Sequence, residues 1–105
     1  MSTPDPLLTE IATLLDAPAG RDDPERLERT LTDGYARALN LEAEKSRLER
    51  RISQMSAAGD EDASAELVDL ARRVEAKDGS LDELRALLVR LRQRHSVAAR
   101  AAARI

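Results

Sequence analysis

The chain has 105 residues with a single Tyr and no Phe, Trp or Cys, so any core must be built from aliphatic side chains. Charged residues make up 35% of it, which is typical of long helices and coiled coils. The lack of Cys excludes disulfides and thiolate metal sites. No segment approaches the ~20 apolar residues that span a bilayer, and the first residues lack the basic start and apolar stretch of a signal peptide. We therefore expect one small cytoplasmic domain without membrane contact.

Residues 1–23 are predicted to form a small unit of their own, an amphipathic helix followed by a linker. Asp5 and Pro6 make a favourable helix start, because Asp caps free backbone N–H groups and Pro lacks the N–H that would go unused at the first helical position. The apolar residues that follow form one stripe: Leu7, Leu8, Ile11, Leu14 and Leu15. A helix this short is marginal in water, so it must dock on another helix.

Residues 24–105 carry two apolar stripes whose members alternate in steps of three and four, the 3.5-residue period of coiled coils. The first stripe consists of Leu27, Leu31, Gly34, Ala38, Leu41, Lys45, Leu48, Ile52 and Met55. The second consists of Leu67, Leu70, Val74, Lys77, Leu81, Leu84, Leu88, Leu91 and His95. The two stripes mirror each other about residue 61, so each member has a facing partner if the chain folds back on itself.

This mirror relation predicts an all-α fold: a short N-terminal amphipathic helix plus a long antiparallel two-helix coiled-coil hairpin. We place the hairpin in residues 24–105, with helices over about 24–58 and 62–101. Gly59 supplies the turn between them. Gly79 is a local helix-stop signal, but the heptad crosses it with no inserted or missing residue, so we expect the third helix to continue through it.

One layer of the predicted seam is charged, because Lys45 faces Lys77 among apolar neighbours. Glu42 and Asp78 flank this layer and are expected to neutralise the two lysines. The layer has two interpretations: an ionic layer that penalises slipped registers, or a binding site for a small anion or nucleotide.

The C-terminal end is basic, with six arginines and no acid from Arg85 onward. Among these, Arg90, Arg94 and Arg100 are the candidate contacts to nucleic acid, since clustered arginines displace counterions from phosphates. The competing interpretation is structural, because cations suit a helix C-terminus and the N-terminal helix offers acidic partners. We favour the structural interpretation.

Apolar residues off the seam are the better lead to a function. The candidate interaction patch consists of Tyr35, Leu39, Leu87 and Val89, all toward the open end of the hairpin. The N-terminal helix is expected to fold back and cover the part of this patch formed by Tyr35, Leu39 and Val89, using Leu8, Ile11 and Leu15. The base would then be a three-helix bundle, with a two-helix arm beyond it.

The sequence shows no combination of nucleophile, base and orienting group, and no phosphate-binding loop or metal motif. We therefore expect a protein that is not an enzyme and has no cofactor. Its expected function is that of an interaction or adaptor protein, binding a protein partner or a second copy of itself through its helix faces. Two different functions stay open beside it: a regulator that binds nucleic acid or the transcription machinery through the arginine-rich end, and a receptor for a small anion or nucleotide at Lys45 and Lys77.

Overall fold

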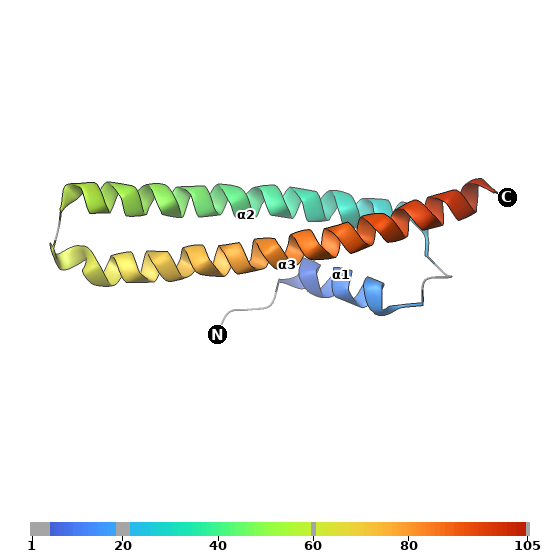
Figure 1. Cartoon of the computed structure of the whole chain (residues 1–105), viewed down its shortest axis with the longest axis horizontal. Helices are drawn as coiled ribbons and strands as arrows, with labels where there is room; N and C mark the ends of the chain where they lie inside the picture. Colours follow the sequence, from blue (N-terminus) through green and yellow to red (C-terminus); the bar gives the residue numbers. More distant parts are fainter. Residues whose placement is uncertain (1–4, 19–21, 60, 105) are drawn as a thin grey trace. The chain divides into compact units, whose positions relative to one another are not determined.

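The computed structural model describes residues 5–18, 22–59 and 61–104, and within them all regular secondary structure is helical. Three α-helices, α1 (Pro6–Asp16), α2 (Pro24–Ala58) and α3 (Ser64–Ala103), are joined in chain order, and a short 3₁₀ helix, η2 (Glu61–Ala63), precedes α3 (Figure 1). Helices α2 and α3 pack together as an antiparallel hairpin, which confirms the predicted all-α fold. None of these described helices is long and apolar enough to cross a membrane.

The helix ends follow from local chemistry. The side chain of Asp5 accepts a hydrogen bond of 3.0 Å from the backbone N–H of Leu7, and Asp23 accepts one of 3.1 Å from Glu25, so each Asp-Pro pair starts a helix. Gly59, which follows α2, has a φ of 64°, a conformation that glycine adopts at low cost. Helix α3 continues through Gly79, as the unbroken heptad predicts.

Both heptad stripes lie on the seam, because each of their members is buried or half-buried. We label the stripe positions a and d, with Leu31 and Leu67 at a. Position g is then the residue before each a, and position e the residue after each d. In an antiparallel helix pair, g residues of both helices line one side of the seam and e residues line the other.

The chain divides into two compact units. Unit 1 comprises Met1–Arg37 and Glu83–Ile105, and thus holds α1 with the start of α2 and the end of α3. Unit 2 comprises Ala38–Asp82, and thus holds the rest of α2, η2 and the start of α3.

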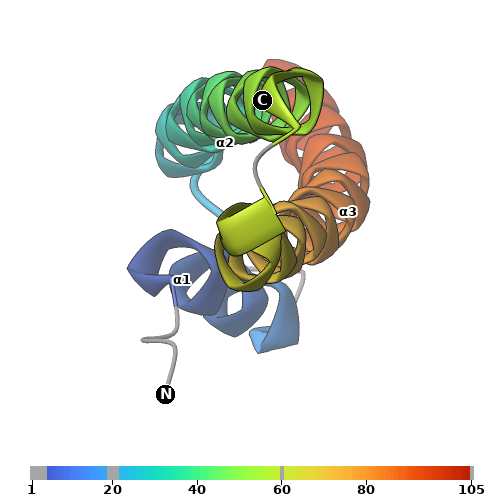
Figure 2. The same ribbon diagram turned by 90° about the vertical axis from the view of Figure 1, so that its left-hand side faces the viewer.

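Helix α1 packs over the seam of unit 1, next to α2 and α3 (Figure 2). Ile11 is completely buried, and a Cβ added to Gly34 would lie 3.7 Å from its Cδ1 atom. The same Cβ would overlap the side chain of Leu88, which is also buried. Gly34 therefore marks a close approach of α2 and α3, where Leu88 occupies the space that a larger residue would fill and Ile11 packs beside it.

The side that α1 covers differs from our expectation, since Tyr35 and Val89 remain 44% and 49% exposed. Tyr35 is an e residue, whereas the arginines that bind α1, Arg37 and Arg94, are both g residues. Helix α1 thus lies on the g side of unit 1. On this side Arg37 and Arg94 bind α1, and Ile11 packs against the seam at Gly34.

Candidate interaction sites

Arg94 is the main polar anchor of α1. Its Nε atom lies 2.6 Å from Asp22, and its other two nitrogens donate to the backbone carbonyls of Leu15 (2.9 Å) and Ala17 (2.5 Å). The side chains of Arg94 and Asp22 are each only 11% exposed. The hydrogen bond with Asp22 raises the pKa of the Arg94 guanidinium above its ordinary value, although desolvation acts in the opposite direction. A planar guanidinium is suited to this site because it can bind three acceptors at once.

The other end of α1 is held by an ion pair of 2.9 Å between Asp5 and Arg37. Burial raises the pKa of Asp5, but the hydrogen bonds from Arg37 and from the backbone N–H of Leu7 outweigh it, and the net shift is downward. Asp5 therefore caps α1 and also ties it to α2.

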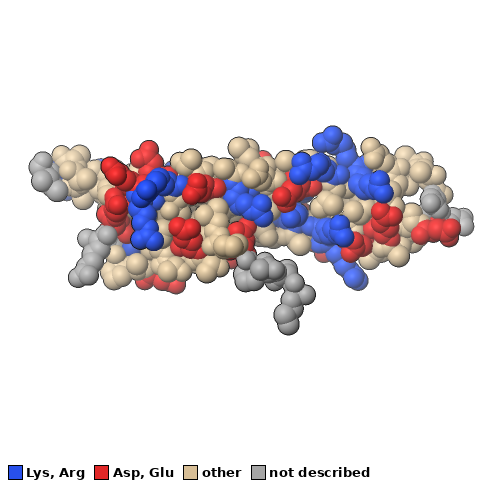
Figure 3. Space-filling model, turned by 180° about the vertical axis from the view of Figure 1, so that it is seen from behind, with Lys and Arg blue, Asp and Glu red and all other residues tan. Residues whose placement is uncertain are grey.

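The three arginines of the candidate basic end, Arg90, Arg94 and Arg100, lie in two different environments. Arg94 is bound to Asp22 and α1, whereas Arg90 and Arg100 are exposed, with Arg100 donating to Ser96 over 3.4 Å. On the face shown in Figure 3, acidic and basic side chains are interspersed and neither sign covers the face from end to end. Arg94 thus has a structural role that the sequence presents only as one of two interpretations.

The charged layer of unit 2 contains two cross-helix ion pairs. Lys45 lies 2.5 Å from Asp78, and Lys77 lies 2.7 Å from Glu44. Asp78 is an e residue and Glu44 a g residue, so the two lysines turn to opposite sides of the seam. This arrangement separates their like charges and gives each a carboxylate partner. Glu44, which was not among the residues that the sequence singled out, is the carboxylate that pairs with Lys77, and Glu42 is exposed at an e position.

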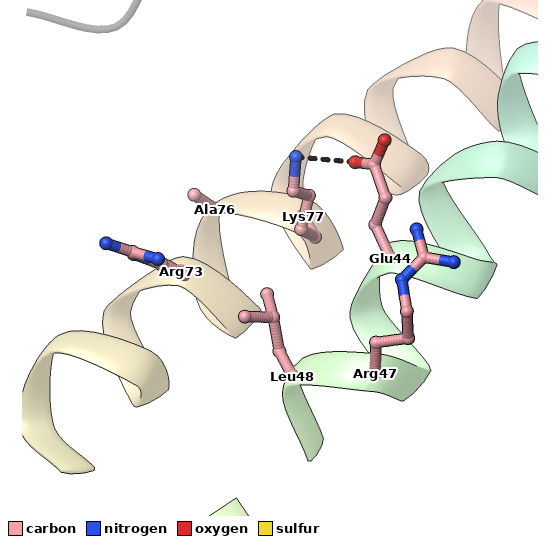
Figure 4. Close-up of a pocket in the computed structure, with 6 residues that line it drawn as sticks. All are labelled: Glu44, Arg47, Leu48, Arg73, Ala76 and Lys77. Atoms are coloured by element: carbon pink, nitrogen blue, oxygen red, sulfur yellow. Dashed lines mark ion pairs between the residues drawn. The ribbon is translucent and has the colours of Figure 1, made fainter. Parts of the chain in front are cut away.

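A hollow of about 510 Å³ opens on the g side of unit 2 beside this layer. Its lining consists of Glu44, Arg47, Leu48, Arg73, Ala76 and Lys77. Figure 4 shows the ion pair of Lys77 and Glu44 reaching across from α3 to α2, with Leu48 between the helices and Arg73 directed outward. The apolar residues Leu48 and Ala76 form the floor of the hollow, and its rim is mainly basic. Only Lys77 of this set was a candidate from the sequence, since the rest become neighbours only when the two helices pair.

The seam of unit 2 is less well covered than that of unit 1. In unit 1 the apolar residues Leu27, Leu31, Leu84, Leu88 and Leu91 are each at most 7% exposed. Most apolar seam residues of unit 2 are only half-buried, and these are Ala38, Leu48, Ile52, Met55, Leu67 and Val74. The difference arises because unit 1 contains a third helix, whereas a two-helix pair leaves both sides of its seam open.

The four residues of the candidate apolar patch differ in exposure. Tyr35 and Val89 are about half exposed in unit 1, and Leu39 is exposed in unit 2. Leu87 is half-buried at position g, one heptad before Arg94, and so lies on the other side of α3 from the e and b residues.

Among the described residues, no three His, Asp or Glu side chains are grouped so that they could hold a metal ion. Comparison of the chain with models of protein families, with curated proteins and with solved structures finds no match.

Proposed function

We propose that this protein is a non-enzymatic interaction module that binds a helix of a partner protein on the g side of unit 2. The difference in seam burial between the two units carries this proposal. In unit 1 the g side is covered by α1, and the apolar seam beneath it is buried. In unit 2 the corresponding heptad positions surround the hollow at Leu48.

The hydrophobic effect supports helix docking at this place. Complete burial of a Leu, Ile or Val side chain contributes about 1.5–3 kcal/mol relative to full exposure. Docking of a partner helix that buries the exposed part of a half-buried seam residue would therefore contribute about 1 kcal/mol to the binding free energy. An amphipathic helix that lays its apolar stripe into a groove between two helices is a common mode of peptide recognition.

A homodimer is the second way in which the open seam could be covered. Three bases and one acid line the hollow. If the hollow of one copy faced the same hollow of another, Arg47 and Arg73 of both copies would meet across the interface. This like-charge arrangement disfavours self-association through the g side and favours a different partner.

Binding of a small anion and binding of nucleic acid receive less support. The Lys45 and Lys77 layer contains a carboxylate for each lysine, so it offers no net charge to an anion. Binding of nucleic acid through Arg90, Arg94 and Arg100 would compete with the bonds by which Arg94 holds Asp22 and α1.

Site-specific photo-crosslinking in the cells that make the protein tests the proposal. A photoreactive residue in place of Ala76, which lines the hollow, should give discrete protein adducts. The same residue in place of Arg72, exposed on the outer face of α3, should not. Equal adducts from both positions, or none from position 76, would contradict a partner site in the hollow.

A further inference from the structure

From the charge around the hollow and the way α1 docks in unit 1, we infer that the partner is an acidic amphipathic helix, with carboxylates flanking its apolar stripe. This inference rests on the proposed function and specifies the chemistry of the partner. It commits to a helix of another protein because the hollow, with more bases than acids, does not complement itself.

Helix α1 is an internal example of such a helix. From Asp5 to Pro18 it contains three acidic residues and no Lys or Arg. It docks by packing Ile11 against the seam at Gly34, with Asp5 paired to one arginine of position g. The second arginine of position g, Arg94, binds its C-terminal carbonyls. Helix α1 thus docks both through its apolar stripe and through polar groups at its two ends.

Unit 2 shares heptad positions with this docking surface, although a leucine stands where unit 1 has Gly34. Arg73 lies three heptads before Arg94 on α3, and Leu48 lies two heptads after Gly34 on α2. Each therefore holds the same heptad position as its counterpart. Ala76 is small and leaves room above the seam for a bulky apolar side chain.

The basic side chains on the rim can engage carboxylates from a partner. Arg73 is paired over 3.1 Å with Asp69 of its own helix, but these side chains are 62% and 58% exposed, and such surface pairs are weak. A carboxylate in a desolvated interface competes well with that pairing. Arg47 is exposed on the α2 side of the hollow (Figure 4). The two arginines thus lie on either side of the apolar floor, where they match acids on both flanks of a docked helix.

The test measures the binding of two labelled model peptides to the full chain by fluorescence anisotropy. Both peptides are three-heptad helices with Leu at positions a and d, and they carry either Glu or Lys at the flanking positions. We expect the acidic peptide to bind at least about tenfold more tightly than the basic one in low salt. A few surface ion pairs with the acidic peptide and a few repulsions with the basic one are enough for a difference of this size. The ratio should shrink strongly at 1 M salt, where the Debye length is about 3 Å.

Matched charge reversals separate a specific site from general attraction. The double variant R47E/R73E should lose most of the preference for the acidic peptide. The double variant R50E/R72E makes the same change of net charge on the same two helices, at exposed positions outside the hollow, and should keep the preference. Circular dichroism checks that the helix content of each variant is unchanged.

The outcomes distinguish this inference from the proposed function. If both peptides bind equally and both are lost with Leu48→Asp, the hollow binds helices but the acidic preference is wrong. An equal loss of preference in R47E/R73E and R50E/R72E would also overturn the acidic preference. If neither peptide binds, or if binding survives Leu48→Asp, the proposed function and the inference are both wrong.

Discussion

Replacement of Gly34 by Ala tests whether α2 and α3 approach each other as closely in unit 1 as the structure indicates. Ala is favoured over Gly inside a helix by about 1 kcal/mol. At Gly34, however, the added Cβ would overlap Leu88 and approach Ile11, and both of these side chains are buried. Overpacking of a filled core costs roughly 1–3 kcal/mol. We therefore expect Gly34→Ala to be neutral or to destabilise unit 1 by up to about 2 kcal/mol.

Gly79→Ala is the matched control, because Gly79 is also within a helix but has nothing within 4 Å of an added Cβ. It should stabilise the protein by about 1 kcal/mol, which corresponds to a rise of roughly 4–8 °C in Tm for a domain of this size. The two variants should thus differ by about 1–3 kcal/mol in urea unfolding followed by circular dichroism. Equal stabilisation by both would refute the close approach at Gly34.

A double-mutant cycle with Leu88→Val assigns the cost to one contact. Val lacks the Cδ2 atom with which the new methyl group would overlap. In the Leu88→Val background, Gly34→Ala should therefore be less damaging than in the natural chain, by about 1 kcal/mol or more. A coupling free energy near zero would show that the destabilisation by Gly34→Ala does not come from the contact with Leu88.

Two further predictions concern the anchors of α1. Arg94→Lys should destabilise unit 1 by about 3 kcal/mol, because an ammonium cannot replace the three hydrogen bonds to Asp22, Leu15 and Ala17. In urea unfolding, its loss of unfolding free energy should be much larger than that of Arg90→Lys, a change at an exposed position. The pKa of Asp5 is lowered by folding, so its contribution to stability should be complete above the ordinary pKa of 3.8 and be lost as the pH falls through the lower folded value. Asp5→Asn should remove that part of the acid sensitivity in unfolding curves measured between pH 5 and pH 2, and an unchanged pH profile would contradict the ion pair with Arg37.

The hairpin was predictable because its signal is repeated along most of the chain. The seam positions from Leu27 to Met55 and from Leu67 to His95 all lie in the interface, and their mirror relation about residue 61 gives the pairing of the helices. The Asp-Pro starts and the glycine at the turn were equally readable, since capping depends on residues that are neighbours in sequence.

The position of α1 was not predictable in the same way. Its apolar stripe could cover either side of the seam, and exposed apolar residues such as Tyr35 pointed to the wrong one. The useful signal was the combination of a small residue on the seam with arginines at position g, Arg37 and Arg94. This pattern identifies the side on which α1 docks only when the packing of all three helices is known.

The partner of Lys77 was missed for a related reason. Lys45 and Lys77 could turn to the same side or to opposite sides of the seam, and a helical projection does not decide between these arrangements. The structure directs them to opposite sides, and Lys77 pairs with Glu44. The hollow next to this pair combines residues from two helices, and no single segment of the sequence carries its signal.

The most direct test of helix binding by unit 2 is a titration of the ¹⁵N-labelled full chain with the acidic three-heptad peptide, followed by amide chemical shifts. We predict that the changes concentrate at Arg47, Leu48, Arg73 and Ala76 around the hollow, while the amide of Ile11, the buried residue of α1, stays unchanged. Changes centred on Ile11, or the absence of any change around Leu48, would contradict a helix-binding site on the g side of unit 2.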